Sequence, residues 1–584
     1  MGLAGSDAGT RMDRPGLVQP VELRSLLSGT GLISSSAGPG LNRSDSGGCP
    51  NSIATRSVMR EHVGVTGRLP NATALGKALR REIAALEIAA SCDATDLWAA
   101  SRDCSSAGLL WTKARVSPHP PDVVAWPESA EQVAALVRLA GKQRVPVVPV
   151  GGGTGTAGGA VPLRGGIVLD TKRLTRPLRI DAGRGAVDAG AGTNGKRLDE
   201  LLSKERLTLG HGPPSLRTAT VGGWLATRSA GLLSSRYGTV ADMVLSLTAV
   251  DGSGEILRTL EGPSAGPDLC KLLLGSEGTL AIFTEVRLRI WRRPRERWLR
   301  AVRFGSLQDA LAAVREVLRS GLRPHIASLH DPLDTLFAGT DPLRVPQPLK
   351  WLAEGAQAEA LRLALRAPLL LNRLIDALPG SSLVVLGFEG DTEDDTAQEG
   401  EAALVICGKE RGEDLGAAPA EWWLASAHRA PWRQAPLFAA GAFVETLDVA
   451  TTWPRAEALY HAVRRAAEGQ ALVRAHFAHA APEGCGIEFT LLGLAGGTAA
   501  EVSSVPRDEA ESDLERAQEA RDAVWNAALT AVADEGATIS HHSGVGSSRQ
   551  AFLHRELGDG MRALRALKQA FDPHGILNPG KLLS

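Results

Sequence analysis

Two adjacent histidines, His541 and His542, are the residues of this chain best suited to chemistry. Histidine titrates near neutral pH, so it can act as a general base that removes a proton from a substrate hydroxyl. We expect the two side chains to point in opposite directions, as neighbours on an extended backbone do, so only one of them needs to face a reacting group. The pair has no i,i+4 spacing and no Cys or carboxylate beside it in sequence, so no metal site is predicted.

Two further histidines, His476 and His479, stand in the segment Arg474-Ala-His-Phe-Ala-His479. A lone histidine is most often a structural residue with satisfied hydrogen bonds. We expect at least one of these four histidines to take part in chemistry.

Three glycine-rich segments follow one another at residues 147–160, 214–231 and 274–280. Glycine has no Cβ, so the backbone N–H groups of such segments can form concave nests that hold anions. One such loop is weak evidence. Three of them predict an extended, phosphate-bearing cofactor that is bound from several sides.

The first segment also contains Gly153-Thr-Gly155-Thr-Ala-Gly158, the G-x-G-x-x-G spacing of NAD(P)-binding folds. That interpretation needs a helix that opens at the third glycine. Pro162 and the pair Gly165-Gly166 oppose a helix there, so a nicotinamide cofactor is disfavoured.

The composition is ordinary for a globular chain, with 43% hydrophobic and 22% charged residues and a formal net charge of -1 among 584 residues. This balance gives no attraction to nucleic acid, and none is expected as a partner. Six scattered cysteines indicate a reducing compartment, and we expect a soluble, cytoplasmic protein. Charged residues interrupt the most apolar stretch, 360–378, so no transmembrane segment is predicted.

The elements that must position these residues form two successive patterns. Residues 1–70 are predicted to be disordered, and residues 71–117 to be a helical segment. In the first pattern, Ser129 is expected to cap a helix, and strands are predicted at Val123–Trp126, Val145–Val150, Gly166–Asp170, Ala186–Ala189, Met243–Val250 and Ala281–Ile290. In the second, helices are predicted at Leu307–Leu318, Arg455–Glu468 and Arg549–Phe571, with strands at Ser382–Phe388 and Cys485–Leu492. The fold class is therefore α+β.

The glycine segments, in this order, resemble those of the vanillyl-alcohol-oxidase-type (PCMH-type) FAD-linked oxidase family. The segments 223–231 and 235–238, together with Ser540-His-His-Ser-Gly544, are most similar to its alkyldihydroxyacetonephosphate synthase branch. The resemblance covers residues 120–584. It implies a PCMH-type FAD-binding domain of two α/β subdomains, at 118–295, and an α+β cap (FAD-linked oxidase C-terminal) domain at 296–584 whose tail returns to the flavin.

The cofactor implied by the resemblance is FAD, bound without a covalent link because the first glycine loop contains no His or Cys. Its expected binding residues are Val150, Gly151, Gly152, Gly153, Thr154, Gly155, Thr156, Pro214, Ser215, Thr218, Thr220, Val221, Gly222, Gly223, Thr227, Ser229, Ala230, Gly231, Tyr237, Gly238, Glu277, Gly278, Thr279, Ile282 and Asn578.

The substrate side departs from the synthase pattern. Ser543 replaces a histidine, Ala481 and Glu488 replace tyrosines, and Ser328 replaces a substrate-facing arginine. Arg433 lies near the place of another arginine, and His211 keeps a family histidine. We take His541, His542, Arg433, Glu488 and His211 as the catalytic candidates. Glu488 is either a base in a dry pocket or a surface residue.

Three functions follow from this pattern. The first is an FAD-dependent oxidoreductase that acts on a hydroxy acid or another alcohol, with an unknown electron acceptor. The second is an alkylglycerone-phosphate-synthase-like transferase, of the ether-lipid type, that uses FAD without net redox change. The third is a non-catalytic FAD-binding relative. The expected partner is a small-molecule substrate, and a homodimer is left open.

Overall fold

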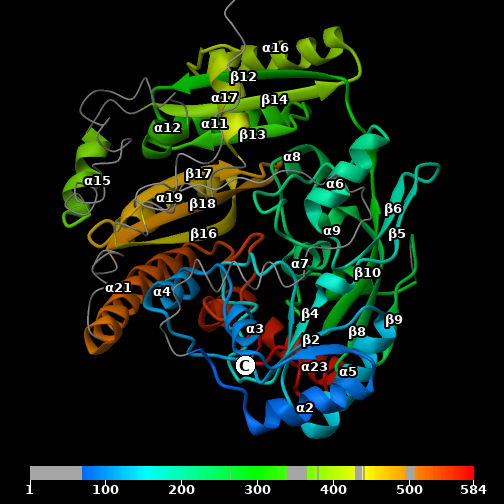
Figure 1. The fold of residues 1–584 in the computed structure, drawn as a ribbon. Helices are drawn as coiled ribbons and strands as arrows, with labels where there is room; N and C mark the ends of the chain where they lie inside the picture. The colour runs from blue at the N-terminus through cyan, green and yellow to red at the C-terminus, as the bar shows by residue number, and fades with distance from the viewer. Residues whose placement is uncertain are drawn as a thin grey trace, which may run out of the picture. The chain divides into compact units, whose positions relative to one another are not determined.

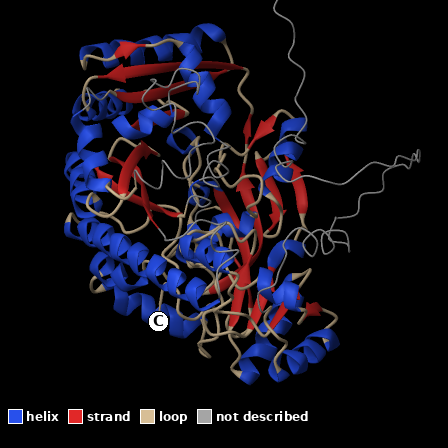
Figure 2. Cartoon of the chain, turned by 60° about the vertical axis from the view of Figure 1, so that its left-hand side comes forward, coloured by secondary structure: helices blue, strands red, loops and turns tan. Residues whose placement is uncertain are grey.

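The computed structural model describes residues 69–262, 265–338, 365–377, 381–427, 437, 441–494 and 507–583. The prediction of disorder for residues 1–70 falls almost entirely outside these residues. The described residues all belong to one unit, Val65–Ser584. Figure 2 shows their strands grouped into sheets with helices packed beside them.

The first sheet has four strands in the order β1-β2-β4-β3, with β1 antiparallel and the others parallel. Its strands are β1 (Ala89–Ser91), β2 (Val123–Trp126), β3 (Val147–Val150) and β4 (Ile167–Asp170), and its helices are α2 (Ala74–Ala85), α3 (Ala94–Ala99) and α5 (Ala130–Gln143). Apolar residues of α2 and α5 pack on the sheet as one core. Ser129 caps α5, because its side chain accepts a hydrogen bond from the Gln132 N–H.

The second sheet has five antiparallel strands in the order β5-β6-β10-β8-β9. They are β5 (Leu178–Asp181), β6 (Ala186–Gly190), β8 (Val244–Asp251), β9 (Ile256–Arg258) and β10 (Ala281–Arg289). Around it lie η1 (Thr171–Arg173), α6 (Gly195–Lys204), α7 (Val221–Thr227), α8 (Ser234–Tyr237), α9 (Val240–Met243) and α10 (Leu269–Leu273). A separate ribbon pairs β7 (Leu207–Thr208) with β11 (Trp291–Arg292).

The third sheet has seven antiparallel strands in the order β15-β12-β14-β13-β17-β18-β16 (Figure 1). They are β12 (Glu296–Phe304), β13 (Ile326–His330), β14 (Ser382–Gly390), β15 (Glu413–Asp414), β16 (Ala442–Thr452), β17 (Leu472–Ala478) and β18 (Gly484–Leu494). Its helices are α11 (Leu307–Arg319), α12 (Pro332–Ala338), α15 (Pro368–Ala377), α16 (Glu393–Lys409), α17 (Ala417–Ala427), α19 (Trp453–Ala467) and α21 (Arg507–Asp534).

The two faces of the seven-stranded sheet differ in chemistry. Side chains alternate between faces along a strand, and one face, which includes Leu329, Phe477 and Ile487, packs into a large core with α11, α16, α19 and α21. The other face carries polar residues on the four strands from β13 to β16. Four helices therefore cover one face, and α17 covers the part of the other face that β12, β13 and β14 form.

The end of the chain returns to the first sheet. After α21 come η4 (Gln550–Phe552), α22 (Leu553–Leu557) and α23 (Gly560–Phe571). Leu577 then bridges in parallel to Val147 of β3, and the Asn578 N–H donates to the Val147 carbonyl at 2.8 Å. Helix α4 (Ser106–Ala114) meanwhile packs against α21 and β16. Both ends of the described chain thus tie the sheets together.

Most predicted strands and helices are present, usually within a few residues of their expected ends. The continuous helix predicted over Arg549–Phe571 is wrong, because Gly558 adopts a φ of 49° and separates α22 from α23. The helical segment 71–117 also contains strand β1. Residues 151–166, all described, form bends and turns, so no helix opens after the G-x-G-x-x-G spacing.

Candidate active site

The first glycine loop forms an open cradle directly after β3. A Cβ on Gly151 would lie 2.1 Å from Thr220 Oγ1, and one on Gly152 would lie 2.3 Å from the Thr218 carbonyl oxygen, so two glycine segments pack closely here. Gly153, with a φ of 66°, would meet nothing within 4 Å. Among the described residues, no N–H from Gly151 to Thr156 donates a hydrogen bond. Free N–H groups beside open space fit a pyrophosphate.

The third glycine segment joins this cradle through backbone contacts. The N–H groups of Gly275 and Glu277 donate to the carbonyls of Leu225 and Ala226 at the end of α7, both at 3.0 Å. A Cβ on Gly278 would lie 2.3 Å from Cγ of Pro149 in β3. The three glycine segments therefore meet at one place, as the cofactor interpretation requires.

The other expected cofactor residues lie in or beside these segments. The Ser215 carbonyl accepts hydrogen bonds from the N–H groups of Thr218 and Ala219, so Pro214, Ser215 and Thr218 form a turn. Thr220 caps α7. Helix α7 contains Val221, Gly222, Gly223 and Thr227, and Ser229, Ala230 and Gly231 follow it. Tyr237 ends α8 and is followed by Gly238. Thr279 precedes β10, and Ile282 lies at the start of that strand.

Two expected cofactor residues, Glu277 and Asn578, also link separate parts of the chain. The Glu277 carboxylate accepts hydrogen bonds from the N–H groups of Val545 and Gly546 at 2.6 and 2.9 Å. The Asn578 amide donates to the carbonyls of Gly159 and Glu277. Burial raises the pKa of Glu277 to about 7, although the two N–H groups oppose this shift. The glycine loops are thereby tied to the segment that carries the paired histidines.

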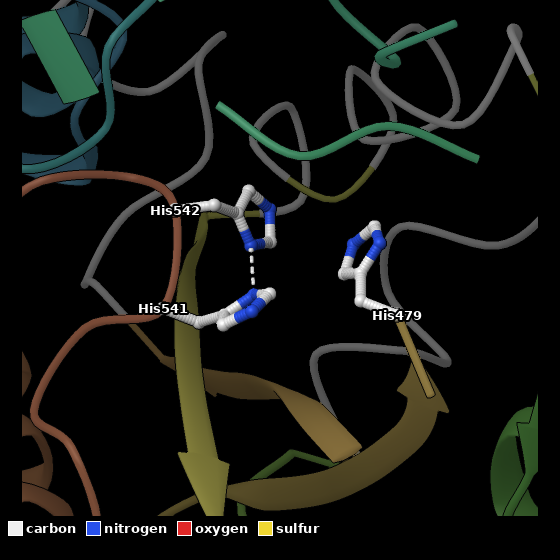
Figure 3. Close-up of side chains that lie close together, drawn as sticks. All are labelled: His479, His541 and His542. Carbon is white, nitrogen blue, oxygen red and sulfur yellow. Dashed lines mark hydrogen bonds between the residues drawn. The ribbon is translucent and has the colours of Figure 1, made fainter. Parts of the chain in front are cut away.

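Three histidine rings come together beside this link (Figure 3). Nδ1 of His541 and Nδ1 of His542 are hydrogen-bonded at 3.0 Å. His479, just after β17, stacks on His541 with 5.3 Å between ring centroids and meets His542 edge-on at 4.9 Å. Residues 541–543 form a bend, so both rings of the pair face His479. The expectation that the two rings point in opposite directions is wrong, because the backbone is not extended there.

Asp448 of β16 holds the bend in place. Its Oδ2 accepts hydrogen bonds from the N–H groups of His541, His542 and Ser543 at 3.0, 2.8 and 3.0 Å. Its Oδ1 accepts from Nη2 of the buried Arg549 at 2.6 Å. Burial alone would raise the pKa of Asp448, but the Arg549 charge and these hydrogen bonds hold that pKa well below its usual value. The bend is therefore built on an ionised carboxylate.

Burial keeps two of the clustered histidines, His479 and His541, neutral at pH 7. It lowers the pKa of His541 to about 4, with a further contribution from His542. Burial, together with the neighbouring histidines, also holds the pKa of His479 well below its usual value. Neutral imidazoles can accept protons or bind metal ions.

His211 is a buried histidine near this half-buried group. It is 2% exposed, and neither ring nitrogen has a hydrogen-bond partner among the described residues. It meets the Trp224 ring edge-on at 4.8 Å, and burial lowers its pKa to about 3. A buried side chain with two unpaired polar atoms is positioned for a ligand.

Polar residues form a row across the face of the seven-stranded sheet that lies opposite the large core. His330 of β13 lies opposite His476 of β17, which lies opposite Glu488 of β18, which lies opposite Asp448 of β16. His476 Nε2 is 3.8 Å from Glu488 Oε2. Glu488 therefore lies on the same face as Asp448, and its side chain is 30% exposed.

Ser328 occupies the place where the resemblance implied an arginine. Its hydroxyl lies 3.1 Å from His330 Nε2, and His330 Nδ1 lies 2.6 Å from Asp334 Oδ2. Arg474 also bonds to Asp334. A buried hydrogen-bonded chain therefore stands at this position. Arg433 lies outside the described residues.

Asp448, Arg549 and Gly486 belong to the candidate site but were not predicted. A Cβ on Gly486 would lie 3.4 Å from His541 Nδ1 and 3.6 Å from the His479 ring, so the small residue leaves room for the imidazoles. Asp448 lies 93 positions before His541 in the chain. It lies on this face because β16 pairs with β18 so that Asp448 stands opposite Glu488, and no local spacing in the sequence reveals that pairing.

Comparison with known proteins matches two successive parts of the chain to family models. Residues 121–260 match the FAD binding domain family model, and residues 293–582 match the model of the C-terminal domain of FAD linked oxidases. The chain belongs to the FAD-linked oxidase family. As predicted, it combines a PCMH-type FAD-binding domain with an α+β C-terminal domain, and FAD is the cofactor. The described residues contain no helix long and apolar enough to cross a membrane.

The names of similar proteins in this FAD-linked oxidase family denote different reactions. Alkyldihydroxyacetonephosphate synthase of Trypanosoma brucei brucei is 28% identical over 499 residues, which cover 81% of this chain and 75% of the relative. D-lactate dehydrogenase of Archaeoglobus fulgidus is 40% identical over 204 residues, 34% of this chain and 45% of the relative. A solved alkyldihydroxyacetonephosphate synthase shares the fold, with a TM-score of 0.66, 22% identity and coverage of 88% and 86% of the two chains.

Removing the Asp448 charge should destabilise the protein strongly. In Asp448→Asn, the buried Arg549 loses its counter-ion and three N–H groups lose a carboxylate, so we expect unfolding free energy to fall by about 3–5 kcal/mol. Urea unfolding measures the change. The control, Asp534→Asn, removes an exposed ion pair with Arg555 and should cost less than about 1 kcal/mol. A loss that small in Asp448→Asn would contradict the role of this carboxylate.

His211 should make the protein sensitive to acid. Its folded pKa of about 3 lies below the unfolded value of roughly 6.5. The stability linked to its neutral form is therefore complete above pH 6.5 and is lost as the pH falls toward 3, by up to about 1.4 kcal/mol per pH unit. Urea unfolding from pH 7 to 4.5 should show a shallower decline in His211→Gln. Exposed Asn526→Ala should keep the wild-type slope, and an equal slope in His211→Gln would refute the assignment.

Proposed function

We propose that this chain is an oxidoreductase that uses non-covalently bound FAD to oxidise a hydroxy acid or another alcohol. The observation that carries the proposal is the cluster of imidazoles at His479, His541 and His542, whose paired histidines are fixed by the ionised Asp448 beside the glycine cradle. Bound FAD would supply an acceptor for the substrate's hydride. The protein must then remove the hydroxyl proton.

His542 is our candidate for the base. Its Nδ1 lies 3.6 Å from Asp448 Oδ2, so a proton that reaches this ring would sit beside a carboxylate. The hydrogen bond between the two Nδ1 atoms lets His541 share that proton, and which nitrogen carries it depends on the tautomer. The hydrogen of the substrate's C–H bond would leave with both bonding electrons as a hydride. The O–H proton would pass to the imidazole, and a carbonyl product would remain.

His211 and Glu488 are candidates for positioning the substrate. His211 offers two unpaired ring nitrogens, and Glu488 lies opposite Asp448 on the polar face. A neutral His211 can donate one hydrogen bond and accept another. Arg433, outside the described residues, remains a candidate for binding an anionic substrate group.

An alkylglycerone-phosphate-synthase-like transferase is the second candidate. The observation in its favour is the similarity to alkyldihydroxyacetonephosphate synthase over 81% of this chain. The substrate side favours the oxidoreductase instead. Ser328, Glu488 and Ser543 replace the arginine, tyrosine and histidine of that branch, and Ser328 is engaged with His330.

Reduction of the flavin by a substrate tests the proposal directly. We expect the visible flavin absorbance to bleach under anaerobic conditions with at least one member of a panel of D- and L-2-hydroxy acids and alcohols. A different result would favour the transferase. In that case no alcohol bleaches the flavin, but the flavin-loaded protein exchanges the acyl group of an acyl dihydroxyacetone phosphate for a fatty alcohol.

Replacing both paired histidines should stop the reaction without loss of the cofactor. In His541→Ala/His542→Ala, flavin reduction should slow by at least about 100-fold, the usual contribution of a general base. Stopped-flow absorbance measures the rate, and the ratio of flavin to protein absorbance measures cofactor content. The control, His461→Ala, changes an exposed histidine on α19 and should keep the wild-type rate. Full activity in the double variant would exclude both residues as the base.

A further inference from the structure

We propose that Glu488 binds an ammonium group and that the substrate of this chain is an amino alcohol. The substrate class rests on the proposed function, which it narrows from any alcohol to one that carries a positive charge. Glu488 of β18 lies between Asp448 of β16 and His476 of β17 in the seven-stranded sheet. Its carboxylate therefore belongs to the polar face on which the bend of the paired histidines is built.

The arginines of this polar face are already bonded to carboxylates. Strands β13, β16, β17 and β18 contain a single arginine, Arg474, and it is bonded to Asp334. Arg549 reaches the same face from the C-terminal segment, where it is paired with Asp448 at 2.6 Å. Neither guanidinium is left to bind an acidic group of a substrate in the bidentate manner that carboxylates and phosphates favour.

Glu488 is the carboxylate of these four strands that no arginine neutralises. Among the described residues its one ion-pair partner is His476, whose Nε2 lies 3.8 Å from Glu488 Oε2, beyond hydrogen-bond distance. Imidazole is a cation only when it is protonated. The negative charge of Glu488 is thus available to a ligand.

The neighbouring histidines supply hydrogen bonds without adding positive charge. Burial lowers the pKa of His541 to about 4 and the pKa of His211 to about 3. The pKa of His479 is also held well below its usual value. Both ring nitrogens of His211 are without a partner among the described residues, so its neutral ring can contact a ligand. The surroundings of the bend therefore attract a cation more than an anion.

Glu488 lies within reach of a substrate held at the paired histidines. A Cβ on Gly486, two residues earlier on the same face, would be 3.4 Å from His541 Nδ1. Residues two apart on a strand are separated by roughly 6.7 Å, and the glutamate side chain can cover part of that distance. The Glu488 side chain is 30% exposed, which leaves its carboxylate accessible. An ammonium group one or two carbons from the reacting hydroxyl can contact it.

The same carboxylate discriminates against acids. An aliphatic ammonium group is charged at neutral pH, as that of lysine is, and its hydrogen bonds to a carboxylate are charge-assisted. A carboxylate or phosphate on the substrate would instead meet a like charge. The ammonium group takes no part in the bond changes. The hydride and the hydroxyl proton leave as in the proposed function, and an amino ketone or amino aldehyde remains.

Matched alcohols that differ in charge test the site on the wild-type protein. One set is 1-amino-2-propanol, propane-1,2-diol and lactate, and a phenyl-bearing set is 2-amino-1-phenylethanol, 1-phenylethane-1,2-diol and mandelate. Both enantiomers of each are titrated into flavin-loaded protein by calorimetry. The amino alcohol should bind at least about tenfold more tightly than the diol, the usual effect of a hydrogen bond to a charged group. The hydroxy acid should bind most weakly.

Two outcomes on the wild-type protein would overturn the ammonium site. Equal binding of the three members of each set, or binding of none, would exclude a charged anchor. Tightest binding of the hydroxy acid would favour an arginine, such as Arg433, in its place.

Charge variants separate a binding role of Glu488 from a structural one. Glu488→Gln should weaken the amino alcohol by about tenfold or more and leave the diol nearly unchanged. Glu488→Lys should reverse the order, so that the hydroxy acid binds best. The control, Glu483→Gln, removes an exposed carboxylate just before β18 and should keep the wild-type order. The ratio of flavin to protein absorbance checks that each variant is folded. Equal weakening of amino alcohol and diol in Glu488→Gln would contradict the proposal.

Flavin reduction distinguishes failure of the site from failure of the proposed function. Anaerobic stopped-flow absorbance follows each compound of both sets. Amino alcohols that bind through Glu488 but never bleach the flavin would overturn the oxidoreductase and leave the ammonium site in place. Bleaching by alcohols irrespective of their charge would overturn the ammonium site and leave the oxidoreductase in place.

Discussion

The candidate site depends on one buried carboxylate, Asp448. It accepts three backbone N–H groups from the bend at 541–543 and pairs with Arg549, which also donates to the carbonyls of Ile539 and Thr446. A charge taken out of water is tolerated only when its partners are complete. The same contacts that make Asp448 stable therefore fix the positions of both paired histidines. A strand that belongs to the C-terminal domain sets the geometry of a loop almost a hundred residues later.

The seven-stranded sheet brings the rest of the site to this point. Its alternation buries Leu329, Phe477 and Ile487 under helices and leaves His330, His476 and Glu488 on the opposite face. The register is strict, because a shift of one residue would move every polar side chain into the helix-covered core. Packing on one face thus determines which chemistry the other face presents.

Local sequence was sufficient to predict most elements and the meeting of the glycine segments. Strands such as Val123–Trp126 have a continuous apolar pattern, and Ser129 caps its helix through a contact three residues away. The site was harder to predict, because its contacts join residues far apart in the chain. Asp448 reaches His542, Glu277 reaches Gly546, and His479 reaches His541. The helix predicted to run through Gly558 failed for a local reason, a left-handed glycine that periodicity does not reveal.

The cofactor-binding part and the substrate-facing part of the molecule are subject to different physical constraints. A pyrophosphate is bound by bare N–H groups, and only glycine permits the approach of Gly151 to Thr220 or of Gly278 to Pro149, so the cofactor half tolerates little variation. The substrate face instead uses side chains on a rigid sheet, where exchanging one residue changes the chemistry without disturbing the backbone. Ser328 illustrates this freedom, because its hydroxyl joins the network of His330 and Asp334 in place of the arginine that the resemblance implied. Relatives with one fold and different reactions are the expected result of such a division. The reaction of this chain must therefore be argued from its histidines and carboxylates, since the glycine loops identify only the cofactor.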